Sequence, residues 1–410
     1  MAKRPALRTN ISLYDDDDDG PASDEKKMAR LRDDADGSTS AKRVNFSAAK
    51  SDESGGEQHN EESGNRKPAS GESSPPLKQS TERTFIPVAV GRKGERDEMQ
   101  DRHHFEENFQ IGVNTSADIR RFAFFGLFDG HAGCKAAEFC AENFAKRLAA
   151  TCAKYAQAGD KILVSMEKAM KKIFIETYKS IDDAFLVEAR KRRPILKDGS
   201  TATTLLLLND VLYCANIGDS RAVVCRRKAD SVDPIVLQLT VDHSPLDFNE
   251  RMRIQKAGGM VKDGRIMGVL EVSRSIGDGQ FKAHGLSCIP DVKKITITSE
   301  DFFVLLACDG LWKTFSSEEA VRFALSKYDE LRNDAKFLAI MNAEVRESAS
   351  TVANDTLETL RLSHVWTKVA DELCKTAVLR GSGDNVSIIL IVFTENLDVH
   401  SSPVTASNSI

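Results

Sequence analysis

The chain has 410 residues, of which 41% are hydrophobic and 29% are charged, so it can bury one large core or two ordinary ones. A formal net charge of -5 gives no overall attraction to nucleic acid or to an anionic membrane, and we expect neither as a partner. No run of about 18 apolar residues occurs, and no hydrophobic segment follows the basic start of the chain. We therefore expect neither a membrane span nor a signal peptide.

Residues 1–84 are rich in Ser, Asp, Glu, Lys and Gly and nearly lack large apolar side chains. Such a segment cannot bury enough surface to offset its chain entropy, so we predict a disordered tail. The basic pairs Lys3-Arg4 and Lys42-Arg43 are either nuclear-import signals or ordinary charges of a solvated tail.

Eight cysteines are scattered along the chain without a Cys-x-x-Cys pair, and several lie within apolar runs. A thiol in such a run behaves as a small hydrophobic side chain, and reduced cysteines are typical of the cytosol and nucleus. We therefore expect structural thiols in a protein of the cytoplasm, and of the nucleus as well.

Apolar segments bounded by Gly, Asp and Asn begin near Phe85, which predicts one folded domain over residues 85–396 and a second disordered tail over 397–410. Short runs rich in Val, Ile, Leu and Phe are typical of buried strands. These runs begin at Phe122, Thr201, Val211, Phe302 and Val386.

Three helical regions lie between these strands. The segment after Gly130 is rich in helix formers and predicts a helix that begins within a few residues of His131. Apolar residues recur at helical spacing in residues 170–185, which predicts a second helix packed on a sheet. A third helical region runs over residues 318–379 with an interruption at 328–333.

Acidic residues gather at the ends of the predicted strands. Asp129, Asp219 and Asp309 follow three strands within two residues, and Asp384 lies just before the last one. Each alone is most simply a turn residue, because a short acidic side chain forms local hydrogen bonds in turns. Together they predict convergence on one rim of the fold, and carboxylates without a His/Cys cluster suit Mg²⁺ or Mn²⁺ better than zinc.

The order of the motifs around these residues resembles the PP2C-type, metal-dependent protein phosphatases, from about Phe85 to Thr394. Seven motifs carry the resemblance, at Arg96 to Asp101, Asp129 to Gly133, Asp198 to Ala202, Gly218 to Arg221, Val272 to Asp278, Ala307 to Gly310, and Gly383 to Asn385. Within that family, the runs GRKGERDEMQD, ERMRIQKAGG and GVLEVSRSIGDGQ look most similar to the integrin-linked-kinase-associated branch.

The resemblance implies an α+β fold, with two antiparallel sheets packed as a central sandwich and helices on both outer faces. It implies a phosphatase that hydrolyses phosphoserine and phosphothreonine with water activated by two divalent cations, Mn²⁺ or Mg²⁺, with a weaker third site. The partners it implies are phosphoprotein substrates and kinase signalling complexes. The chain shows no long heptad pattern, and we expect a monomer.

The resemblance also implies a set of metal ligands. Asp129 is expected to bridge both ions, with the Gly130 carbonyl on one of them. Asp278 and Asp384 are expected to complete the other, and Asp219, together with Asp278, to form the weaker third site.

Three further positions bear on this set. The resemblance places Gln100 and Asp101 among the metal ligands, but Gln100 stands where many family members have Glu. A neutral amide, or a water that it holds, would then replace a charge and raise the cation concentration needed. Lys313 stands where many family members have Asp.

Arg96 and His131 are the expected catalytic residues. Arg96 offers a planar, permanently charged fork for two phosphate oxygens, and its alternative is an ordinary surface arginine. His131 follows the expected bridging aspartate by two residues and is expected to protonate the leaving serine or threonine oxygen. Outside this context, a histidine beside a turn would be only a hydrogen-bonding side chain.

Residues 242–264 resemble a flap segment beside the catalytic cleft. Within it, Arg251, Arg253 and Lys256 either bias the flap toward acidic or phosphorylated substrates or are ordinary exposed charges.

Two other functions remain open at this point. A pseudophosphatase scaffold would be favoured by loss of Asp129, Asp278 or Asp384, and all three are present. A metallohydrolase of small phosphoesters or nucleotides is the other, although the chain has no Walker-type phosphate loop.

Overall fold

A computed structural model describes residues 12–13, 83–112, 118–156, 162–228, 231, 233–348 and 354–394. Most of the predicted tail over 1–84, and the whole of 397–410, lie outside these residues. Two parts of the first tail are described, a short strand β1 (Ser12–Leu13) and the start of β2 at Thr84. Within the described ranges, no helix has the length and apolar character that a membrane span requires.

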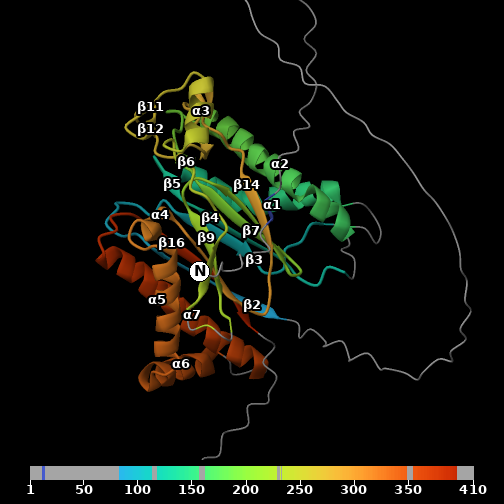
Figure 1. Ribbon diagram of the computed structural model, residues 1–410, viewed down its shortest axis with the longest axis vertical. Helices are drawn as coiled ribbons and strands as arrows, with labels where there is room; N and C mark the ends of the chain where they lie inside the picture. The colour runs from blue at the N-terminus through green and yellow to red at the C-terminus, as the bar shows by residue number, and fades with distance from the viewer. Residues whose placement is uncertain are drawn as a thin grey trace, which may run out of the picture. The chain divides into compact units, whose positions relative to one another are not determined.

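Two antiparallel sheets form the centre of the fold (Figure 1). The first has six strands, in the order β1, β14 (Asp291–Thr296), β8 (Val211–Ile217), β7 (Ala202–Leu208), β4 (Phe122–Phe128) and β3 (Arg102–Glu106). The second has five strands, in the order β10 (Ile235–Gln238), β9 (Arg221–Arg226), β15 (Asp301–Ala307), β16 (Val386–Thr394) and β2 (Thr84–Arg92). The five predicted strands correspond to β4, β7, β8, β15 and β16.

The central strands read as continuous apolar runs because both of their faces are covered. Successive side chains of a strand point to opposite faces. In β4, Phe125 packs in the core between the two sheets, whereas Phe124 packs in the core beneath the helices. In β15, Leu306 and Leu305 divide in the same way.

Helices cover the outer face of each sheet (Figure 1), which confirms the predicted layers. Helices α1 (Lys135–Tyr155) and α2 (Ile162–Lys191) cover the six-stranded sheet, and the apolar stripe predicted in α2 is buried. Helices α5 (Ser317–Leu331) and α7 (Asn354–Leu379) cover the five-stranded sheet, and α6 (Ala335–Ser348) packs on α7.

Short elements complete the fold and include those that position the site. They are β5 (Gly130–His131), β6 (Gly199–Ser200), β13 (Ile276–Gly277), α3 (Phe248–Lys256), β11 (Val261–Lys262), β12 (Arg265–Ile266), the 3₁₀ helix η1 (Lys282–His284) and α4 (Asp309–Trp312). Strands β5, β6 and β13 form a small sheet of their own, in the order β13, β6, β5.

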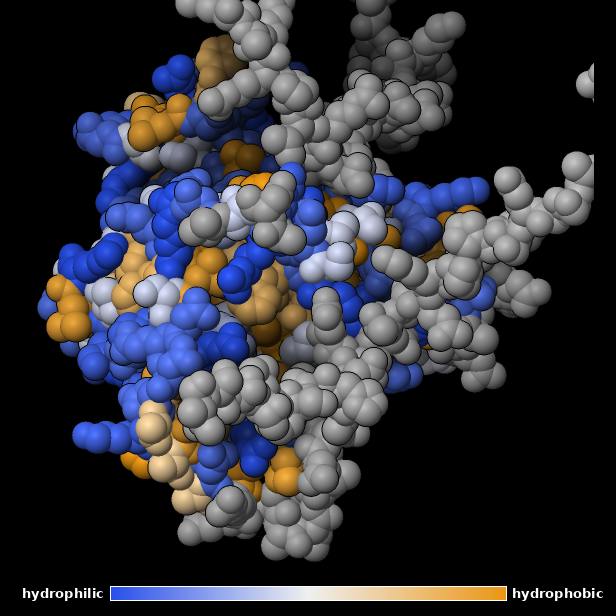
Figure 2. Space-filling model, turned by 60° about the horizontal axis from the view of Figure 1, so that its bottom comes forward, coloured by the Kyte–Doolittle hydropathy of each residue, from blue (hydrophilic) through white to orange (hydrophobic). Residues whose placement is uncertain are grey.

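Most of the large hydrophobic side chains that are exposed lie in residues 241–289, around α3 and the hairpin of β11 and β12. In the view of Figure 2, hydrophilic side chains cover most of the described surface, with hydrophobic ones in smaller patches between them.

Candidate active site

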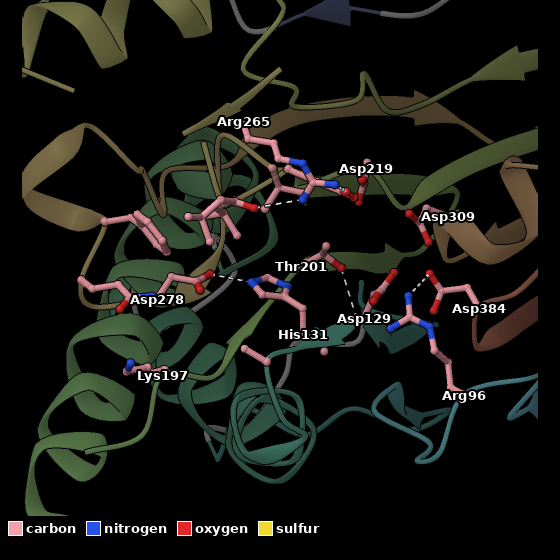
Figure 3. A pocket seen from close by; sticks show the side chains of 18 of the residues that line it. Arg96, Asp129, His131, Lys197, Thr201, Asp219, Arg265, Asp278, Asp309 and Asp384 are labelled. Carbon is pink, nitrogen blue, oxygen red and sulfur yellow. Dashed lines mark hydrogen bonds and ion pairs between the residues drawn. The ribbon is translucent and has the colours of Figure 1, made fainter. Parts of the chain in front are cut away.

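A cavity of about 270 Å³ lies where several strands of both sheets begin or end. Its polar lining combines carboxylates with cationic side chains and one imidazole (Figure 3). The charged and polar residues that line it are Arg96, Asp129, His131, Lys197, Thr201, Asp219, Arg265, Glu271, Asp278, Gln280, Asp309, Lys313 and Asp384.

Asp129 is the centre of an acidic cluster in this cavity. It belongs to two groups of side chains whose potential ligand atoms lie within 4.8 Å of one another. One group joins it to Asp101 and Cys308, and the other joins it to Asp219 and Asp309. Strand ends bring these residues together, as the sequence predicts: Asp129 directly follows β4, and Asp309 follows β15.

The cluster is electrostatically unfavourable without a cation. Burial first, and then the charges of neighbouring carboxylates, raise the pKa of Asp129 well above its usual value. The same two causes raise the pKa of Asp101 to about 6 and that of Asp219 to about 7, and they also raise the pKa of Asp309. A bound cation would relieve both effects, because it replaces lost hydration and compensates the negative charges.

Asp101 provides a second indication that the cluster fits a metal. Its side chain is 4% exposed, and its Oδ2 atom has no hydrogen-bond partner among the described residues. A buried carboxylate oxygen without a partner is costly, and metal coordination would satisfy it. Cys308 is a poor ligand for Mn²⁺ or Mg²⁺, because its sulfur is soft and is already bonded, donating to the Asn385 carbonyl at 3.3 Å and accepting from the Ser387 N–H at 3.1 Å.

Cationic side chains close one side of the cavity at Asp384. Arg96 donates from Nη2 to Asp384 Oδ2 at 2.9 Å and from Nε to the Gly383 carbonyl at 3.3 Å. Lys313 Nζ donates to the same Asp384 oxygen at 2.9 Å. Burial alone would raise the pKa of Asp384, but the hydrogen bond and charge of Lys313 hold it below its usual value.

His131 and Asp278 form a hydrogen-bonded pair on the other side of the cavity. His131 Nε2 lies 2.7 Å from Asp278 Oδ2, which also accepts a hydrogen bond of 2.7 Å from Ser275 Oγ. Burial alone would lower the pKa of His131, but the hydrogen bond to Asp278 and its charge raise the pKa above the usual value. The imidazole is therefore suited to donate a proton near neutral pH.

This placement revises the expectation for Asp278. In Figure 3 it lies on the opposite side of the His131 ring from the carboxylates of Asp129, Asp309 and Asp384. The position beside Asp129 that was expected for Asp278 is taken by Asp309. The sequence marks Asp309 only as a strand-end carboxylate, because the partner of each acidic side chain depends on sheet order rather than on spacing along the chain.

Gly199 is a site residue that sequence reasoning missed. In the small sheet it lies opposite His131 on one side and Gly277 on the other. A Cβ atom at this position would overlap both the Asp278 carboxylate and the His131 ring. Only glycine therefore leaves room for the pair, and the signal available in sequence was its place in the Asp-Gly-Ser-Thr motif.

Thr201 and Asn385 hold the rim in place. The Asp129 main-chain N–H donates to Thr201 Oγ1 at 3.2 Å, and the Thr201 N–H donates to the Asp129 carbonyl at 2.9 Å. Asn385 is 4% exposed, and its side chain tethers the loop that contains Arg96 to the start of β16. Its amide accepts from the Gln100 N–H at 2.7 Å and donates to the carbonyls of Lys93 at 2.7 Å and Glu98 at 3.0 Å.

Gly130 and Gln100 are neighbours. Gly130 is buried and lines the cavity, and a Cβ atom added to it would overlap the Gln100 carbonyl. Gln100 therefore contacts the site through its main chain, and it is not among the residues that line the cavity.

The predicted flap contributes different residues from those expected. Arg253 donates to Glu250 Oε2 at 2.6 Å and to the Ser273 carbonyl at 3.0 Å, so it stabilises the flap internally. Arg251 and Lys256 are exposed and do not line the cavity. Arg265 does line it, and its side chain extends toward Asp219 in Figure 3.

Comparisons with known proteins identify the family of the chain. The family model described as protein phosphatase 2C matches residues 88–386. The chain is 42% identical over 301 residues to the integrin-linked kinase-associated serine/threonine phosphatase 2C of Mus musculus and of Homo sapiens, covering 73% of this chain and 70% of each relative. It is 31% identical to protein phosphatase 1A of Bos taurus, covering 73% of this chain and 69% of that one. The crystal structure of serine-threonine phosphatase 2C from Toxoplasma gondii has the same fold, with a TM-score of 0.58 and 22% identity over 76% of this chain and 95% of that one.

Proposed function

This chain belongs to the protein phosphatase 2C family of metal-dependent serine/threonine phosphatases, and we propose that it hydrolyses phosphoserine and phosphothreonine in the cavity around Asp129 and His131. One observation carries the assignment of this cavity. A partly buried acidic cluster, a guanidinium and a polarised imidazole all line the same space. These are the groups that phosphate-ester hydrolysis requires for the nucleophile, the phosphoryl oxygens and the leaving group.

We assign the metal site to two ions, Mn²⁺ or Mg²⁺. The proposed ligands are the carboxylates of Asp101, Asp129, Asp309 and Asp384 and the carbonyl of Gly130. The raised pKa values of Asp101, Asp129 and Asp309 and the unpartnered oxygen of Asp101 support their place in this set, and Asp384 and Gly130 line the same cavity. When bound, the ions would activate a water as the nucleophile and polarise the phosphoryl oxygens.

Two expected ligands have smaller roles in this proposal. Asp219 lies within the cluster and would bind at its edge or through a water. Gln100 adjoins Gly130, and it would contribute an amide oxygen or a water that the amide holds.

The remaining steps belong to side chains of the chain itself. Arg96 is half-exposed at the rim. Its guanidinium can leave Asp384 and bind two oxygens of the phosphate instead. His131 donates its proton to the serine or threonine oxygen as that oxygen leaves. Asp278 orients the imidazole and keeps it protonated until that step.

We propose phosphoproteins of kinase signalling complexes as the substrates, and a monomer in the cytoplasm or nucleus as the working form. The similarity to relatives whose names associate them with integrin-linked kinase supports the choice of substrates. An exposed rim suits a protein substrate, because a phosphorylated loop can reach Arg96 without opening the fold.

Phosphate release from a phosphothreonine peptide tests the function. The full chain should release phosphate with Mn²⁺ and stop with EDTA, and Asp129→Asn should lower the rate by more than about 100-fold. Asp233→Asn is the matched control, because its carboxylate is 80% exposed and does not line the cavity. No release from the folded chain at any Mn²⁺ concentration would indicate a scaffold, and a preference for ATP over the peptide would indicate a small-phosphoester hydrolase.

A further inference from the structure

Lys313 brings a positive charge into the acidic cluster from the chain itself. It directly follows α4, one helical turn after Asp309, so the two side chains lie on the same face. Its Nζ lies 2.6 Å from Asp309 Oδ2 and 2.9 Å from Asp384 Oδ2. The ammonium group therefore joins the carboxylate that follows β15 to the carboxylate that precedes β16.

The charge balance of the cavity points to a definite number of metal ions. The carboxylates that influence one another around Asp129 are Asp101, Asp129, Asp219, Asp309 and Asp384. Two divalent ions and the ammonium of Lys313 would together compensate all five charges, and Arg96, which pairs with Asp384 at the rim, adds a further positive charge. A third divalent ion would leave the cluster with excess positive charge, at a cost that grows with burial.

Lys313 also lies near Asp219, the carboxylate that the resemblance assigns to the weaker third metal site. The potential ligand atoms of Asp219 and Asp309 lie within 4.8 Å of each other, and Lys313 forms an ion pair with Asp309. The ammonium and a divalent cation would repel each other there, because both would be held by Asp309. Lys197, the other lysine of the cavity, has no ion pair with a described residue.

We propose that Lys313 is a tethered cation that takes the place of a third divalent ion, so that this chain binds two ions rather than three. The inference rests on the metal site proposed above. Before metal binds, Lys313 holds Asp309 and Asp384 together and compensates part of their charge. It also weakens the binding of the two ions, because they must enter beside a fixed positive charge.

The test is a count of bound Mn²⁺ on the full chain, by equilibrium dialysis and metal analysis, with affinities from titration calorimetry. Wild type should bind two ions per chain. Lys313→Asp should bind three, because it replaces a cation with a ligand. Lys313→Met and Lys313→Gln keep most of the side-chain length without its charge, and they should bind Mn²⁺ about tenfold more tightly.

A second readout is the melting temperature in EDTA. Lys313→Met should melt below wild type without metal and gain more from added Mn²⁺, whereas the control Lys197→Met should match wild type in both respects. Three ions on wild type, or Lys313 variants that match Lys197→Met in affinity and melting temperature, would overturn the inference. Absence of Mn²⁺ binding would overturn the metal site as well, and two bound ions without phosphatase activity would overturn the proposed function alone.

Discussion

Asp309 and Asp278 are both carboxylates next to the end of a strand, but their neighbours give them different chemistry. Asp309 lies with Asp129 and Asp219 in the acidic cluster, where burial raises its pKa. Asp278 is 2% exposed and is bonded to His131 and Ser275. The first arrangement suits a metal ligand, and the second suits a residue that positions and charges an imidazole.

We expect substitutions of the two aspartates to have different effects on metal binding and catalysis. Asp309→Asn should weaken Mn²⁺ binding by at least about tenfold, because it removes a ligand charge. Asp278→Asn should leave Mn²⁺ binding near that of wild type and lower kcat. Because Asp278 raises the pKa of His131, the alkaline limb of the rate profile should also move to lower pH in this variant.

Calorimetric titration with Mn²⁺ and pH–rate profiles of the two variants check this prediction. Weaker Mn²⁺ binding in Asp278→Asn than in Asp309→Asn would contradict it. An unchanged alkaline limb in Asp278→Asn would show that the carboxylate does not act through His131.

At the scale of elements, the small sheet of β5, β6 and β13 sets the geometry of the proton donor. Strand β6 lies between the strand that carries His131 and the strand that precedes Asp278. Because Gly199 has no side chain, the imidazole and the carboxylate can meet across it. The catalytic pair is therefore built by three short strands of two residues each.

Gly199→Ala should separate the pair and leave the acidic cluster in place. We expect kcat to fall by about 100-fold, the loss typical of a catalytic group displaced by about 1 Å, while Mn²⁺ affinity stays near that of wild type. Gly383→Ala is the control at the same rim, because its added Cβ would have no neighbour closer than 3.9 Å. Equal kcat values for the two variants would contradict the role given to Gly199.

Elements with a clear hydrophobic pattern could be predicted from the sequence. The strands from Phe122 and Val386 are continuous apolar runs, and the stripe of α2 follows the helical repeat, so burial alone determines them. Strands β5, β6 and β13 are too short to show any period, and β6 lies in a motif of turn residues. Their pairing depends on tertiary contacts that spacing does not contain.

The site could be predicted only in part from the sequence. The convergence of Asp129, Asp219 and Asp384 on one cavity follows from their places at strand ends. The exchange of Asp278 for Asp309 could not be seen, because spacing along the chain does not show which of the two lies beside Asp129 once the strands have paired. The cationic partners Lys313 and Arg265 also depend on the fold, since charged side chains carry no burial signal of their own.

At the scale of the whole molecule, the acidic cluster should make the stability of the metal-free chain depend on pH. The raised pKa values of Asp101, at about 6, and Asp219, at about 7, mean that the folded chain keeps protons that the unfolded chain releases near pH 4. Stability should therefore fall as pH rises from about 5 to 8. The raised pKa of His131 acts in the same direction, whereas the lowered pKa of Glu250 affects stability only below about pH 5.

Melting temperatures at pH 5 to 8 check this dependence. In EDTA we expect a decrease of at least about 5 °C over this range, and saturating Mn²⁺ should reduce or remove it by compensating the carboxylates. A melting temperature in EDTA that is constant or rises with pH would contradict the electrostatic account of the cluster.

The most direct test of the metal centre is a crystal structure of the full chain with Mn²⁺, measured at a wavelength where manganese scatters anomalously. We predict two anomalous peaks in contact with Asp129, with Asp309 and Asp384 among their ligands and Asp278 still bonded to His131. A peak coordinated by Asp278, or no peak beside Asp129, would contradict the site described here.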